Sequence, residues 1–424
     1  MAGLARPGKL AASKPRDSHR EPRLTKIDAA SGEDSSALQA LWPWGVLGAA
    51  YGLSMTITPF FYDGLNLEED MIGKLTGAQG IGVIFAAGIA RRLAVNIGPS
   101  RAFASSVFLY AILVTIFGQL SSPLTLAIAR FSDGALAVIA IVALEIALTS
   151  NLDDGSERAR RLGVMASIGA VGFCVGALAA KALAIWLSFP TIFAIAGVVA
   201  VLAAGFGLVK ITGNGPTPDA SNTSDTADTT HRRILSRGKH ALFGAFSSGV
   251  FHATWIVLMP LAVMQITGLP KEQLLWLAPL HILGVILLTP WLVRISPGPI
   301  GIALLSLACS AAIFLASLAS HAAMIFGLVF LIGGASAALQ ARMLTSLLDV
   351  AGTSRDATHA NTLNASLGAV GKVIGPVLLG MIAAQQGPDA LLKALAVIWL
   401  LCACAALSAR FLSNTSSAQG HTHG

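Results

Sequence analysis

Twelve long apolar stretches, separated by short polar or Gly- and Pro-containing breaks, follow one another along this sequence. A helix of about 20 residues crosses a hydrocarbon layer of about 30 Å, and these stretches have that length. They are residues 41–62, 73–92, 101–119, 122–149, 163–187, 189–210, 241–266, 273–294, 298–318, 323–349, 361–386 and 390–411. With 54% hydrophobic and 12% charged residues among 424, the chain is too apolar for one water-soluble core. The sequence therefore predicts an all-α membrane protein with twelve transmembrane helices.

A repeated segment relates the two halves of the chain. Residues 165–180 align without a gap within residues 364–380, 199 positions later, and both copies contain Gly-Ala-Val-Gly. At helical spacing the glycines of each copy share one face, where another membrane helix can approach closely. They are Gly169, Gly172 and Gly176 in the first copy, and Gly368, Gly371 and Gly375, followed by Pro376, in the second. The match indicates duplication of a six-span unit, with chance similarity between Ala-rich helices as the alternative.

Soluble segments divide the chain around these spans. Residues 1–40 mix charged residues with Ser, Pro and Gly, which predicts a disordered tail. Residues 211–240, rich in Thr, Ser, Asp and Asn and then basic, are typical of a linker. We therefore expect six spans in residues 41–210, six in residues 241–412, and a second tail at 413–424.

Lys and Arg residues are distributed unevenly between the two sides of this topology. If the N-terminus is cytoplasmic, 21 of the 28 basic residues lie on the cytoplasmic side, as the positive-inside rule requires. We therefore expect a multi-pass protein of the cytoplasmic (inner) membrane with both termini cytoplasmic. The inside loops account for the net charge of +7, so no nucleic-acid partner is predicted.

Several kinds of chemistry lack their sequence signature. The four cysteines, Cys174, Cys309, Cys402 and Cys404, lie in predicted spans at spacings that suit neither a metal cluster nor a disulfide framework. No nucleophile-base arrangement, metal set or phosphate loop is visible. We expect no enzyme, no metal and no cofactor.

The first span carries Tyr51, Ser54, Thr58 and Tyr62 at spacings of three and four, which puts them on one helix face. In a bundle this polar stripe should face protein or water. Two interpretations stay open: the stripe lines a cavity, or its hydroxyls bond neighbouring helices.

The fourth span carries Arg130, Asp133, Gly134 and Glu145 within about a third of the helix circumference. Arg130 falls near the middle of the hydrocarbon layer, where a lone charge costs at least about 3 kcal/mol. We interpret the charged stripe as a proton or substrate site facing the bundle interior. The alternative is that Arg130 and Asp133 neutralise each other one turn apart.

The second half has candidates of its own. Ser248, His252 and Trp255 share a face of the seventh span, and His252 is either a proton-handling group or a hydrogen-bonded structural residue. His281 in the eighth span is a weaker candidate for the same role.

Two further cations lie in the second half. Arg342 in the tenth span either contributes to a site or pairs with Asp349 and reaches toward the cytoplasm. Lys372 lies too deep in the eleventh span to reach bulk water, and therefore needs a partner, a cavity or a substrate.

These motifs resemble the major facilitator superfamily. Arg130-Phe-Ser-Asp-Gly134 matches the family's Arg-x-x-x-Gly signature in the same span, whereas the loop before residue 101 keeps only Gly98 and Arg101 of the family pattern. The Gly-x-x-x-Gly-Pro signature of proton-linked exporters occurs at Gly371 to Pro376, but Ala177 replaces the proline in the first copy. The resemblance implies two pseudo-symmetric six-helix bundles around a central cavity, lined chiefly by spans 1, 4, 7 and 10.

The resemblance also implies a secondary active transporter that works by alternating access. The buried charges lead us to expect a small organic solute, anionic or zwitterionic, carried by a monomer with proton coupling, as in a symporter, through Asp133, Glu145 or His252. The alternatives are a proton-linked efflux pump for drugs or metabolites, and a non-transporting receptor or scaffold with the same fold.

Overall fold

A computed structural model describes residues 25–149, 155–211, 235, 238–295, 298–319, 321–351 and 354–420. Most of the predicted linker, residues 1–24 of the predicted N-terminal tail and the last four residues of the C-terminal one lie outside these ranges. The chain forms two compact units, residues 1–38 and residues 39–424. The described part of the first unit is the beginning of a helix, and the second unit holds all the predicted spans.

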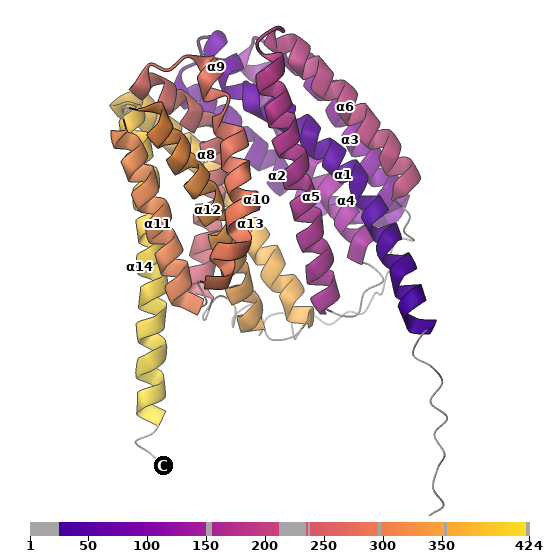
Figure 1. Cartoon of the computed structure of the whole chain (residues 1–424), viewed down its shortest axis with the longest axis vertical. Coiled ribbons are helices and arrows are strands. Elements are labelled where there is room, and N and C mark those ends of the chain that lie inside the picture. Colours follow the sequence, from indigo (N-terminus) through magenta and orange to yellow (C-terminus); the bar gives the residue numbers. More distant parts are fainter. Residues whose placement is uncertain are drawn as a thin grey trace, which may run out of the picture. The chain divides into compact units, whose positions relative to one another are not determined.

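Twelve long helices and one short one make up the described chain, which contains no strand (Figure 1). They are α1 (Thr25–Gly64), α2 (Glu69–Ile97), α3 (Pro99–Phe117), α4 (Pro123–Thr149), α5 (Gly155–Leu183), α6 (Phe189–Lys210), α8 (Lys239–Thr267), α9 (Lys271–Leu274), α10 (Leu277–Ile295), α11 (Gly298–Leu318), α12 (Ala322–Ala351), α13 (Ser354–Gln386) and α14 (Pro388–Gly420). The predicted all-α membrane fold is confirmed. Eleven of the described helices are long and apolar enough to cross a membrane. The remaining long helix, α1, carries Pro43, Pro59 and the polar stripe and is not among these eleven.

The helices of the two halves pack in the same pattern. In the first half α5 packs on α1, α4 on α2, and α6 on α3. In the second half α13 packs on α8, α12 on α10, and α14 on α11. These are equivalent pairs when the helices are numbered from the start of each half, so the halves are pseudo-symmetric as the repeat predicts.

The glycines of the repeat lie where the paired helices touch. A Cβ atom at Gly172 would overlap the carbonyl oxygen of Gly45 on α1, and one at Gly371 would overlap that of Phe246 on α8. A side chain at either position would therefore push the two helices apart. The repeated segment thus brings α5 against α1 and α13 against α8 in equivalent ways.

Consecutive spans alternate in direction, which gives the second unit two distinct ends (Figure 1). We call the end where α1 enters and α14 leaves the tail end, and the opposite end, which carries α9, the hairpin end. Two seams join the halves, α2 with α13 and α5 with α10. In the first seam, Gly80 of α2 lies so close to α13 that its Cβ would be 2.9 Å from the carbonyl carbon of Lys372.

Side chains tie the two halves together at the hairpin end. Gln265 of α8 donates a hydrogen bond to Glu69 of α2. The ammonium of Lys181 on α5 lies 4.3 Å from the ring centroid of Trp276, just before α10. We call these two cross-half contacts the hairpin-end contacts, and the halves cannot separate at that end without breaking them.

Candidate functional site

A central cavity of about 540 Å³ lies between the two halves. Its volume falls in the range of sites that enclose small organic ligands. Of the helices expected to line it, α1, α4, α8 and α12 do so. Residues of α2, α5, α10 and α13 also line it, because these helices form the seams that enclose it from the sides.

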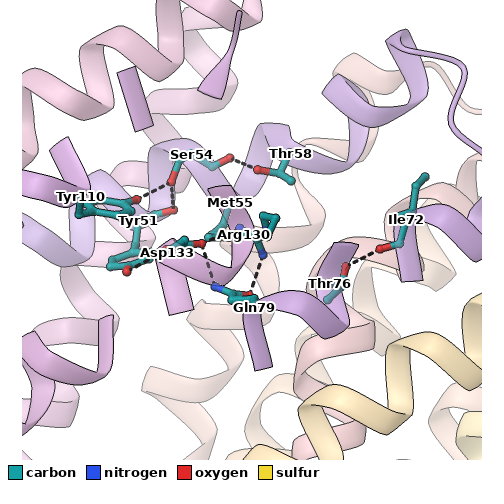
Figure 2. A network of polar contacts seen from close by, with 10 residues as sticks. All are labelled: Tyr51, Ser54, Met55, Thr58, Ile72, Thr76, Gln79, Tyr110, Arg130 and Asp133. Atoms are coloured by element: carbon teal, nitrogen blue, oxygen red, sulfur yellow. Dashed lines mark hydrogen bonds and ion pairs between the residues drawn. The ribbon is translucent and has the colours of Figure 1, made fainter. Parts of the chain in front are cut away.

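A polar network from three helices lies at the wall of this cavity (Figure 2). Arg130 Nη1 donates to Asp133 Oδ2 at 2.7 Å, and Arg130 Nη2 donates to Gln79 Oε1 at 2.7 Å. Gln79 Nε2 in turn donates to Asp133 Oδ2 at 2.9 Å, which closes a ring of three side chains. The Tyr51 hydroxyl donates to Asp133 Oδ1 at 3.1 Å. We call Tyr51, Gln79, Arg130 and Asp133 the Asp133 network.

The Asp133 network is almost fully withdrawn from solvent. Arg130 is 2% exposed and Asp133 is 4% exposed. Three donors satisfy the carboxylate, and the guanidinium charge is balanced at hydrogen-bond distance. This arrangement is the mutual neutralisation considered from the sequence, extended by Gln79 and Tyr51. Burying such a pair is tolerable because each charge has its partner and hydrogen bonds, with Arg130 Nε the one atom of the pair that has no partner in the described chain.

Gly134 explains why the network forms at this position. A Cβ atom at Gly134 would overlap the carbonyl oxygen of Gln79. The missing side chain therefore lets α2 approach α4 one residue beyond Asp133, which brings the Gln79 amide within reach of both charges. Similarly, Gly82 lies one turn further along α2 against the Phe131 carbonyl oxygen.

The polar stripe of α1 divides between the central cavity and a smaller one. Tyr51 lines the central cavity, whereas Ser54 and Thr58 line a cavity of about 20 Å³ beside Arg130 and Asp133. The Ser54 hydroxyl lies 3.0 Å from that of Tyr110, and Thr58 donates to the Ser54 carbonyl oxygen at 2.8 Å. The smaller cavity is roughly the size of one water molecule.

The second half contributes Lys372, His252 and Gln340 to the wall of the central cavity. Lys372 and Gln340 are exposed there although both lie well inside membrane-spanning helices. His252 Nδ1 lies 2.8 Å from the Ser248 carbonyl oxygen. Nδ1 also lies 3.1 Å from the Ser248 hydroxyl, so a protonated Nδ1 can donate to the carbonyl oxygen and an unprotonated one can accept from the hydroxyl.

An aromatic cluster supports this part of the wall. The rings of Phe251 and Trp255 stack with centroids 5.0 Å apart, and the rings of Trp255 and His281 lie 5.7 Å apart. Trp255 and His281 both line the cavity and are buried. Ser248 is also buried and acts on the cavity through His252 rather than by lining it.

Two further sequence-derived candidates, Glu145 and Arg342, line neither of these cavities. Glu145 is half-buried near the tail end of α4, where Thr149 donates to its carbonyl oxygen at 2.7 Å. Arg342 is half-buried on α12, and within the described chain it forms no ion pair with Asp349, which is exposed. These positions lie nearer the tail end than the Asp133 network.

Two amides of the site were missed by sequence reasoning. Gln79 and Gln340 are uncharged, so neither carries the energetic cost that drew attention to Arg130 and Lys372. The available signal was a lone amide in an apolar span, Gly-Ala-Gln79-Gly in one case and Ala-Leu-Gln340-Ala in the other. Such a side chain in a membrane helix needs a protein partner or a cavity.

Comparison with known proteins places this architecture among membrane transporters. The family described as Major Facilitator Superfamily matches residues 45–376. No curated protein matches the sequence.

Solved structures with the same fold cover most of the chain. A bacterial homolog of the human lysosomal transporter Spinster, in an inward-facing and unoccupied conformation, is 15% identical with a TM-score of 0.69, covering 89% of this chain and 96% of the other. The nucleoside transporter NupG is 12% identical with a TM-score of 0.65, covering 89% and 98%. The human organic anion transporter MFSD10 (TETRAN) is 12% identical with a TM-score of 0.62, covering 88% and 99%. At these identities the likeness concerns the fold alone.

Proposed function

This chain belongs to the major facilitator superfamily, and from that premise we propose that it is a secondary active transporter of a small organic solute, anionic or zwitterionic. The observation that carries the proposal is the central cavity, which both halves line and which holds charged side chains at the middle of membrane-spanning helices. A site between two pseudo-symmetric halves can be exposed to either side in turn when the halves rock against each other.

The hairpin-end contacts support a two-state cycle. They hold the halves together at one end, so the cavity opens to that side after they break. A solute changes the balance between the two states if it contacts one of them more favourably. We infer that the hairpin end faces outward and the tail end faces the cytoplasm in the inner membrane, in keeping with the distribution of Lys and Arg.

We assign proton coupling to Asp133 ahead of the other candidates, Glu145 and His252. As a carboxylate, Asp133 accepts hydrogen bonds from Arg130, Gln79 and Tyr51. Protonation would remove the negative charge that balances Arg130 and would replace one acceptor by a donor. The α1, α2 and α4 side chains would then have to rearrange. Protonation would therefore change the relative free energies of the inward-open and outward-open states.

The test is flux into proteoliposomes that contain the purified chain, with radiolabelled carboxylates and amino acids as probes. A gradient of one pH unit is worth about 1.4 kcal/mol per proton and should support up to about tenfold accumulation of a transported probe. Asp133→Asn should abolish the accumulation while leaving exchange of labelled for unlabelled solute. Asp389→Asn is the matched control, because Asp389 lies half-buried at the start of α14 and does not line the cavity.

Three outcomes would contradict parts of this proposal. Binding without flux would favour a receptor or scaffold. Accumulation that persists in Asp133→Asn would show that the coupling proton binds at another residue. Transport restricted to organic cations would exclude the anion or zwitterion assignment and favour a drug efflux pump, for which the largely apolar lining of the cavity is suited.

A further inference from the structure

The charge on the wall of the central cavity is unbalanced. Among the described residues that line it, Arg130 and Lys372 are the two basic Lys or Arg side chains, and none is Asp or Glu. Asp133 neutralises Arg130 at 2.7 Å. Lys372 has no carboxylate within ion-pair distance among the described residues. The lining therefore carries one positive charge that the described protein does not balance.

The backbone of Lys372 is fixed between two neighbouring helices. The preceding residue, Gly371, packs against the Phe246 carbonyl oxygen of α8. On the other side, Gly80 of α2 approaches the Lys372 carbonyl carbon and the Val373 nitrogen. Such packing anchors the ammonium at mid-membrane depth, where a cation without a partner is costly. The side chain is exposed to the cavity, so an entering anion can reach it.

Two further polar side chains of the second half, His252 and Gln340, line the same cavity as Lys372. The His252 ring contacts Ser248 through Nδ1. Gln340 of α12 is exposed to the same cavity and can donate through its amide nitrogen. All three belong to the second half of the chain, so that half supplies both the charge and the neighbouring hydrogen-bonding groups.

The remainder of the lining suits an apolar body. Aliphatic and aromatic side chains from both halves form it, among them Val83, Ile141, Phe173, Ile256, Ile282 and Val285. Burial of apolar surface against such a wall stabilises a bound ligand by about 25 cal/mol per Å² before ordering costs are subtracted.

We propose that the solute is an amphipathic organic monoanion, held by its carboxylate or equivalent group at Lys372 and Gln340 and by its apolar body against the remaining wall. The inference rests on the proposed transport function and narrows its solute class. A zwitterion would also need an acceptor for its own cation, but the described lining of the cavity contains no Asp or Glu, and Asp133 behind Arg130 already receives three donors. A second negative group would lack a cation, because Arg130 is engaged.

Matched probes test the charge preference directly. We would measure binding of 4-phenylbutyrate, 4-phenylbutanol and 4-phenylbutylamine to the purified full chain in lipid nanodiscs, from the shift in unfolding temperature. The acid should bind more tightly than the alcohol, and the amine most weakly. Lys372→Gln should reduce the preference for the acid over the alcohol by about tenfold, the scale of a close charge pair in a partly desolvated site.

Two further variants control this experiment. Lys372→Arg keeps the charge and should keep the preference for the acid. Lys393→Gln removes an exposed lysine that is paired with Asp389 at the start of α14, and should have no effect. Equal binding of all three probes, binding of none, or an unchanged preference in Lys372→Gln would overturn the proposal.

A measurement without ligand tests the same positive potential. In a background with the four native cysteines replaced by serine, Gln340→Cys places a thiol in the cavity. An anionic methanethiosulfonate should label it faster than a cationic one, relative to their rates with a thiol in solution. Adding Lys372→Gln should remove the difference, and equal relative rates with Lys372 present would refute the unbalanced charge.

The outcomes separate this inference from the proposed function. Preferential binding of 4-phenylbutyrate without flux in proteoliposomes would leave the anion site in place and refute transport. Flux of the alcohol or amine probe that ignores Lys372→Gln would leave transport in place and refute the anion site.

Discussion

At the residue scale, Gln79 connects two opposite charges because a primary amide both accepts and donates. Its oxygen accepts from Arg130 and its nitrogen donates to Asp133 (Figure 2). Neither a carboxylate nor an ammonium could do both. The uncharged residue therefore holds the ion pair in one geometry without altering its net charge.

Replacing this amide should damage both stability and transport. In Gln79→Leu, Arg130 and Asp133 each lose a hydrogen bond in a buried site, which costs about 1–3 kcal/mol per group left without a partner. We expect a lower unfolding temperature by differential scanning fluorimetry and reduced flux. Gln119→Leu, at an exposed position between α3 and α4, should change neither. Equal melting temperatures for Gln79→Leu and the unaltered chain would show that the amide does not stabilise the pair.

The sequence predicted the charged members of this site better than the uncharged ones. Arg130 and Lys372 stand out because a charge in a membrane helix demands an explanation. Whether such a charge meets a partner on its own helix or on another depends on packing. The role of Gln79 depends on how closely α2 approaches α4, which one span by itself cannot reveal.

At the element scale, glycines decide which helices touch. Gly134 admits the backbone of α2, Gly172 admits α1, and Gly371 admits α8. In lipid, helix association depends on such close backbone contact, because there is no hydrophobic drive between helices. The Arg-x-x-x-Gly signature of α4 thus combines a charge with the space that its partner helix needs.

A pair of glycine substitutions separates helix propensity from packing. Gly205→Ala on α6 meets no neighbouring atom within 4 Å and should stabilise the protein by up to about 1 kcal/mol through helix propensity. Gly134→Ala must displace the Gln79 carbonyl oxygen and should destabilise it by about 1–3 kcal/mol. Thermal unfolding of both variants checks this. A Gly134→Ala protein as stable as Gly205→Ala would refute the tight contact.

Helix periodicity and apolar length were sufficient to predict the elements. Both are local properties, so the twelve spans follow from the sequence to within several residues. The short helix α9 was not expected because four residues carry no periodic signal. Helix α1 begins at Thr25, inside the stretch expected to be a polar tail, since polar composition alone does not distinguish a solvated helix from coil.

At the scale of the whole molecule, the halves make side-chain contacts across the hairpin end, and transport requires these contacts to break and re-form. Pseudo-symmetric packing could be predicted from the repeat. The difference between the two seams, α2 with α13 and α5 with α10, could not be predicted. It depends on side chains that are not repeated in the two halves. Gly73, Gly77 and Gly80 pack closely on α13, whereas Lys181 and Trp276 join α5 to the start of α10.

Locking the hairpin end should stop transport. In a cysteine-free background, Glu69→Cys with Gln265→Cys places two thiols where the hairpin-end hydrogen bond now lies. A short bifunctional methanethiosulfonate should link them, abolish flux in proteoliposomes, and release it after reduction. The two single-cysteine variants are controls and should keep their flux after treatment. Undiminished flux in the linked protein would show that this end need not open.

The crossing of α2 and α13 brings the proposed anion-binding residue and the proposed proton-binding network onto two helices that touch each other. Gly80 seats the backbone of Lys372, while the adjacent Gln79 holds Arg130 and Asp133. A tilt of α13 at this crossing point would therefore displace the Lys372 ammonium and the Gln79 amide together. Binding of an anion at Lys372 can then change the proton affinity of Asp133 through this movement of the helices, without direct contact between the solute and the proton.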